Sequence, residues 1–217
     1  MSGCNCPKAT TQTTVTDTTC EFNINQIHRI WEVRKDEVVW NISTPASNVP
    51  ATITALAPEA STGWTTLKTA PDSTKVIYLP LFGGEPTITP GEEITFGGGD
   101  NSTLNGKIQH IGFSPSEFLA RYDGLTSAQE SELDEIRCEG SDIEVYFVTY
   151  DNKIIGKLDA ATSNLFTGIP VESALVLLGR SVQGFSAKDS NQFKFQLAKN
   201  WSETMHKITP TFNALAF

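Results

Sequence analysis

The chain has 217 residues, 39% of them hydrophobic, and carries a net charge of −9 with an isoelectric point of about 4.8. This length suits one large β domain or two small ones, and the apolar content is enough for a packed core. No run of about 18 apolar residues occurs, so no membrane span is predicted, and the sparse, scattered basic residues argue against a sequence-reading nucleic-acid protein.

The beginning of the chain differs in composition from the rest. Residues 1–20 are polar and rich in threonine, which is typical of an extended arm, whereas residues 21–217 are predicted to form a single β-rich structural domain. Residues 1–6 lack the charged and apolar regions of a signal peptide, so we expect synthesis in the cytoplasm. The four cysteines are Cys4, Cys6, Cys20 and Cys138, and a reducing compartment favours free thiols. A metal site remains an alternative only if Cys20 or Cys138 folds back onto Cys4 and Cys6.

β-branched and aromatic residues mark the first strands. They dominate residues 21–42, where strands with a turn at 35–36 are predicted, and residues 75–81, where one strand is predicted. Between these segments, residues 61–70 are predicted to form a short helix with Trp64 facing inward.

The stretch from residue 92 to 138 combines a hairpin with a helix. Strands are predicted at 92–96 and 104–112, joined by a glycine-rich turn whose glycines take positive φ. One bent helix or two short helices are predicted over 114–138, because two segments have the pattern of a helix N-terminus. These segments are Ser114-Pro115-Ser116-Glu117 and Thr126-Ser127-Ala128-Gln129, and Gly140 provides a stop.

The last third of the chain is predicted to consist mostly of strands. Residues 142–150 alternate apolar and polar side chains, which predicts a half-buried strand, and a two-residue turn at Asp151-Asn152 follows. Further strands are predicted at 153–158, 174–178, 182–185 and 193–197, with a final strand or docked extension in 200–217. Together these elements predict a mainly β fold, a β-sandwich or barrel with one helix packed beside it.

The negative charge is concentrated in one part of the sequence. Residues 92–144 contain twelve acidic residues against three basic ones, a net charge of −9, whereas the remainder of the chain is neutral. A negative face repels nucleic acid or binds cations, and it can equally be a solvated helix face that aids solubility. Both interpretations stay open at this point.

No catalytic, cofactor-binding or metal-binding residue is predicted, and an enzyme is not expected. The histidines have no metal-ligand spacing, and a run of exposed helix carboxylates lacks the apolar pocket that raises one pKa. The glycines at 97–99 are not followed by the Gly-Lys-Ser/Thr of a phosphate loop. The residues considered are His28, His110, His206, Glu130, Glu132, Asp134 and Glu135.

Three stretches of the sequence resemble segments of known proteins. They are Thr-Phe-Gly-Gly-Gly-Asp-Asn-Ser-Thr-Leu-Asn-Gly at 95–106, Trp64-Thr65-Thr66-Leu67 with 72–76, and Asn200-Trp201-Ser202 with 209–213. Each resembles a segment of virion structural proteins of tailed bacteriophages of gut bacteria. Within that class the resemblance implies a tail-tube or tail/neck ring protein, a β-sandwich or barrel with one helix beside it that reaches the next subunit through an extended arm.

The resemblance also implies partners. We expect a hexameric or larger ring of identical copies around a conduit through which genomic DNA passes without sequence-specific binding, contacts with other virion proteins, and location in the virion after synthesis in the host cytoplasm. The arm 1–20 and the tail 200–217 are the expected inter-subunit elements. One alternative is a capsid decoration protein. Another is a carbohydrate- or ligand-binding β-sandwich that uses exposed tryptophans, namely Trp31, Trp40, Trp64 or Trp201.

Overall fold

The computed structural model describes residues 24–42, 57–98, 106–158, 164–182, 184–185 and 187–217. Of these, Ile24 and Glu92–Ser114 belong to one compact unit, and Asn25–Gly91 and Pro115–Phe217 to a second. The arm predicted at 1–20 lies outside the described residues, as do Cys4, Cys6 and Cys20.

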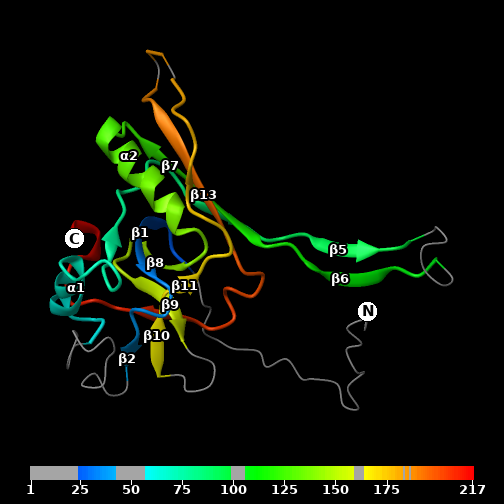
Figure 1. The fold of residues 1–217 in the computed structure, drawn as a ribbon, viewed down its shortest axis with the longest axis horizontal. Helices are drawn as coiled ribbons and strands as arrows, with labels where there is room; N and C mark the ends of the chain where they lie inside the picture. Colours follow the sequence, from blue (N-terminus) through cyan, green and yellow to red (C-terminus); the bar gives the residue numbers. More distant parts are fainter. Residues whose placement is uncertain (1–23, 43–56, 99–105, 159–163, 183, 186) are drawn as a thin grey trace. The chain divides into compact units, whose positions relative to one another are not determined.

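The second unit contains two antiparallel sheets (Figure 1). The larger sheet runs in the order β2 (Trp40–Asn41), β10 (Leu165–Thr167), β9 (Ile154–Leu158), β8 (Ile143–Thr149), β1 (Ile27–Arg34) and β3 (Ile77–Tyr78). In addition, β11 (Ile169–Pro170) pairs with β8, and β14 (Met205–Ile208) pairs with β9. The smaller sheet runs in the order β12 (Val176–Leu177), β13 (Ser190–Leu197), β7 (Ser116–Asp123) and β4 (Thr87–Thr89).

The described part of the second unit also contains two short α-helices and two 3-10 turns. The helices are α1 (Ser61–Lys68) and α2 (Ser127–Ile136), and the turns are η3 (Arg137–Glu139) and η4 (Ala214–Ala216). The predicted mainly β, sandwich-like fold class is therefore confirmed.

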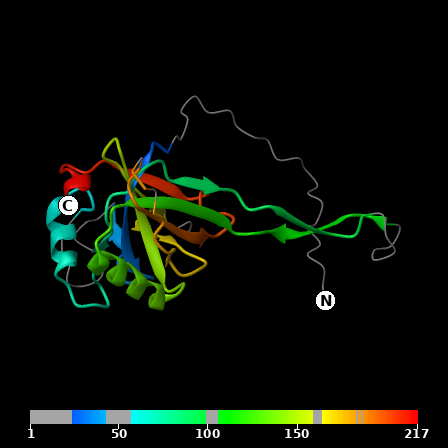
Figure 2. The ribbon, with the colours of Figure 1, turned by 90° about the horizontal axis from the view of Figure 1, so that it is seen from above.

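An aromatic cluster covers one face of the larger sheet. The ring of Trp64, on α1, lies 4.7 Å from the rings of both Trp31 and Trp40. Figure 2 shows α1 and the C-terminal turn η4 side by side, and Thr211 bonds to the carbonyl oxygen of Glu59 just before α1. Helix α1 and the C-terminal segment thus close this face together, and the inward position predicted for Trp64 is confirmed.

The smaller sheet covers the opposite face. Phe118 of β7 stacks on Phe147 of β8 with ring centroids 5.6 Å apart, and on Phe195 of β13 at 4.6 Å. Strand β8 is therefore covered on both faces, and all seven of its residues are buried. The half-buried strand predicted from the alternation at 142–150 is wrong for this reason.

The first half of the helix predicted over 114–138 is a strand. Residues of β7 alternate strictly between buried and exposed positions, with Ser116, Phe118, Ala120 and Tyr122 inward. Pairing with β13 along the whole length of β7 outweighs the local capping pattern at 114–117. Ser114, the expected N-cap, instead accepts a hydrogen bond from the backbone N–H of Glu92 at 2.7 Å, and Ser116 is buried in the sheet.

The second half of that prediction is confirmed. Thr126 forms a capping box with Gln129 at the start of α2, and Gly140, with a φ of 67°, follows η3. The turn at Asp151-Asn152 is also confirmed, with Asn152 at a φ of 58°. The strand predicted at 75–81 shrinks to β3, and the strand predicted at 182–185 is replaced by a turn at Gly184.

A close backbone approach at Gly156 gives a test of this packing. A Cβ at residue 156 would collide with the carbonyl oxygen of Thr167 and lie 2.6 Å from the ring of Phe166, so Gly156→Ala should lower the free energy of unfolding by about 2 kcal/mol. Urea unfolding followed by tryptophan fluorescence measures the change. Gly179→Ala, where a Cβ meets nothing within 4 Å, is the matched control and should change stability by less than about 0.5 kcal/mol.

Candidate functional site

The first unit contains a two-stranded antiparallel ribbon formed by β5 (Glu93–Phe96) and β6 (Gln109–Phe113), shown as a long hairpin in Figure 1. The hairpin predicted at 92–112 is therefore confirmed. At its base, the backbone N–H of Ser114 donates to the carbonyl oxygen of Glu92 at 2.9 Å. Gly97 and Gly98 take positive φ, as predicted for the glycine-rich turn.

The ribbon carries large apolar side chains that remain in contact with solvent. All four residues of β5 are exposed, and so are four of the five in β6. The relative exposure is 45% for Ile94, 48% for Phe96, 68% for Ile108, 62% for Ile111 and 50% for Phe113. Five such side chains give the hairpin an exposed apolar surface of the kind that marks a contact with another molecule.

Both faces of the ribbon take part in this surface. Ile94 and Phe96 are two residues apart in β5 and therefore share one face. On the other face, the rings of His110 and Phe113 lie 4.8 Å apart, and His110 Nδ1 is 2.7 Å from a carboxylate oxygen of Glu93. Among the described residues no third strand joins β5 or β6, so the ribbon has neither a core of its own nor a paired outer edge.

The residues considered for chemistry do not form a site. His28 lies beside the ring of Tyr150 and His206 beside that of Phe166, on different strands. In the part of the chain that the structure describes, no group of three or more His, Cys, Asp or Glu side chains is placed to hold a metal ion. Cys138 is an exposed free thiol.

Many of the described carboxylates of the acidic segment 92–144 are paired or buried. Five of its twelve carboxylates form ion pairs with arginine or lysine, and Glu93 contacts His110; the five are Glu117, Asp123, Glu130, Asp134 and Glu139. Glu144 is buried in β8. The sequence count therefore overstates the exposed negative charge, and α2 retains Glu132 and Glu135 as exposed carboxylates outside these pairs.

Three of the four tryptophans proposed for carbohydrate binding lie inside the protein. Trp31, Trp40 and Trp64 are all fully buried in the core. Trp201 is half-buried, with its ring edge-on to Phe147 at 6.1 Å. A carbohydrate site that uses the first three side chains is therefore excluded.

The tail 200–217, predicted as an inter-subunit element, packs within its own unit. Ile208 and Ala214 are buried in the aromatic core, and Phe212 and Phe217 pack against it. Arg29 Nη1 donates to the carbonyl oxygen of Phe217 at 2.6 Å and holds this end of the chain in place. The tail is thus part of the core in this structure.

Comparison with known proteins adds no relative, since no protein-family model and no curated protein sequence matches the chain. Within the described ranges, neither α1, α2 nor any other helix has the length and apolarity needed to cross a bilayer.

Two carboxyl groups are buried on opposite faces of the paired strands β1 and β8. Glu32 and Glu144 are each 2% exposed, and each has one carboxylate oxygen without a hydrogen-bond partner. Burial raises the pKa of Glu32 from 4.5 to about 7, Glu139 adds to the rise and Arg34 opposes it. Burial likewise raises the pKa of Glu144 to about 7, with a further rise from Asp36.

These carboxyls make stability depend on pH. Between pH 4.5 and about 7 the folded protein keeps protons on these two carboxyls that the unfolded chain has released. The free energy of unfolding is therefore highest below pH 4.5, falls as pH rises through this range, and has lost the contribution of the protonated carboxyls above about pH 7. The cost of ionisation at higher pH is up to about 3 kcal/mol for each group.

Glu32→Gln should therefore stabilise the protein at pH 8 by about 1–3 kcal/mol and have little effect at pH 5. Urea unfolding at both pH values measures the difference. Glu132→Gln, at an exposed carboxylate on α2, is the control and should leave stability unchanged at both. An equal effect of Glu32→Gln at pH 5 and pH 8 would contradict the assignment.

Proposed function

We propose that this protein is a structural subunit of the virion of a tailed bacteriophage, a tail-tube or tail/neck ring component that assembles with copies of itself around a DNA conduit. The proposal involves no chemical step. The β5–β6 ribbon is the element through which one copy contacts the next.

The observation that carries the proposal is the exposed apolar ribbon. An isolated two-stranded hairpin is at best marginally stable in water, because it has no third strand or helix against which to bury its side chains. A neighbouring copy supplies that cover, and burial of an isoleucine or phenylalanine there contributes roughly 1.5–3 kcal/mol. Several such side chains on each subunit are enough to drive assembly, since a closed ring repeats the contact.

The virion role is supported by the resemblance at 95–106, which begins on β5 and ends just before β6. The segment that resembles virion proteins is therefore adjacent in sequence to the two strands that are proposed to drive assembly. The net charge of −9 also suits a conduit, because DNA is repelled rather than held by a negatively charged wall.

Negative-stain electron microscopy of the purified protein over a range of concentrations tests this proposal. Rings or stacked tubes with a central hole are the expected result. A protein that stays monomeric at the highest concentration contradicts self-assembly and leaves a capsid decoration protein as the better interpretation.

A matched pair of variants tests the role of the ribbon. Ile108→Ser/Ile111→Ser removes its two most exposed apolar side chains and should weaken assembly by about a hundredfold or more, as measured by sedimentation velocity. Leu81→Ser/Val182→Ser removes two exposed apolar side chains of the second unit and should assemble like the unmodified protein. Equal assembly of the two variants would show that the ribbon is not the contact.

A further inference from the structure

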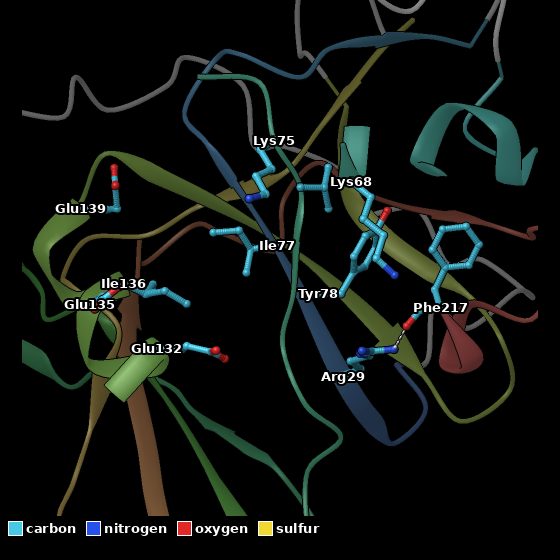
Figure 3. A pocket seen from close by; sticks show the side chains of 11 residues that line it. Arg29, Lys68, Lys75, Ile77, Tyr78, Glu132, Glu135, Ile136, Glu139 and Phe217 are labelled. Atoms are coloured by element: carbon cyan, nitrogen blue, oxygen red, sulfur yellow. Dashed lines mark hydrogen bonds between the residues drawn. The ribbon is translucent and has the colours of Figure 1, made fainter. Parts of the chain in front are cut away.

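A groove runs along β3 in the second unit (Figure 3). Its main part has a volume of about 600 Å³ and lies between β3 and the helix α2. A second hollow of about 280 Å³ shares residues of both walls with it, including Tyr78 and Ile136. Together the two hollows are lined by the chain from Lys75 to Pro80, which includes β3.

The groove exposes the backbone of an edge strand. Among the strands that the structure describes, β3 is the last in the larger sheet and pairs with β1 alone. The N–H of Leu79 donates to the carbonyl oxygen of Ile30, so residues 77 and 79 direct their backbone groups toward β1. Because successive residues of a strand direct these groups to opposite sides, the N–H and C=O of Tyr78 face the free edge.

One wall of the groove is acidic. Helix α2 contributes Glu132 and Glu135, and η3 contributes Glu139 (Figure 3). Glu139 is already paired with Arg34 at 2.8 Å. Glu132 and Glu135 have no such ion pair within the described chain, so this wall offers two carboxylates to a positively charged ligand.

The other wall is aromatic and carries three cations, Arg29, Lys68 and Lys75, of which the first two have partners. The rings of Tyr78 and Phe217 lie 5.4 Å apart on this side. The Arg29 guanidinium donates to the carbonyl oxygen of Phe217, and the Lys68 ammonium lies 5.4 Å from the centroid of the Tyr78 ring. Lys75 lies near one end of the groove in Figure 3. This wall therefore suits an apolar side chain.

We propose that the free edge of β3 accepts an extended segment of a partner protein as an added strand. Side chains of a strand alternate between its two sides, so the segment that fits has basic residues toward Glu132 and Glu135 and apolar residues toward Tyr78 and Phe217. Backbone hydrogen bonds to Tyr78 provide the affinity that does not depend on side chains. This inference concerns the second unit alone and does not rest on the proposed virion role.

The probe is an acetylated and amidated ten-residue peptide of alternating lysine and valine, titrated into the full-length protein by isothermal calorimetry. Saturable one-to-one binding is expected. Glu132→Gln/Glu135→Gln should weaken that binding about tenfold, because two charge pairs across a partly exposed surface are lost.

Asp134→Asn/Asp142→Asn removes the same charge outside the groove and should change the affinity less than about twofold. Equal weakening by both double variants would reduce the effect to net charge and overturn the proposed site.

Methylation of the peptide backbone tests strand addition directly. Two peptides are made with N-methyl groups on alternate amides, so that each peptide is blocked along one edge of the strand and the two are blocked along opposite edges. The peptide blocked along the edge that faces β3 should lose binding, and the other should retain it. Equal binding of the two peptides, or no binding of the unmodified peptide, overturns the proposal. If the unmodified peptide does not bind but Glu132→Gln/Glu135→Gln abolishes self-association, the groove is instead a contact between copies of this chain.

Discussion

Strand β8 is covered on both faces, and the packing of the second unit depends on this double cover. On one side the cover consists of Trp64 on α1 together with the C-terminal segment, and on the other of Phe118 on β7. Because burial removes apolar surface from water on both sides, β8 and its neighbour β1 form the centre of the core. The same burial encloses Glu32 and Glu144 and links core stability to pH.

The β5–β6 ribbon is the opposite case. Its two strands are hydrogen-bonded to each other and carry large apolar side chains, but within the described chain no other layer covers these side chains. A side chain such as Ile108, left mostly in solvent, gains its hydrophobic stabilisation only when another surface excludes water from it. This difference between a self-sufficient core and an uncovered ribbon is the physical basis for proposing an assembly subunit.

Sequence patterns predicted the secondary structure correctly where the local preference of the residues and their tertiary packing agree. Phe193 and Phe195 alternate with polar residues in β13, and Asn152 adopts the positive φ of a two-residue turn. They were insufficient at β7, where Ser116 and Ala120 occupy inward positions without the size that signals a core. Two further features could not be predicted, because burial is decided by residues distant in sequence. Glu32 is buried although its charge predicts a surface position, and the apolar side chains of the ribbon are exposed although their apolarity predicts burial.

Amide hydrogen exchange at increasing protein concentration tests the central claim most directly, because it reports on β5 and β6 separately from the core. The account predicts that ribbon amides exchange rapidly in the dilute protein and become protected as particles assemble, while β8 amides are protected throughout. Ribbon amides that are already protected in the monomer, or that stay unprotected in assembled particles, would contradict it.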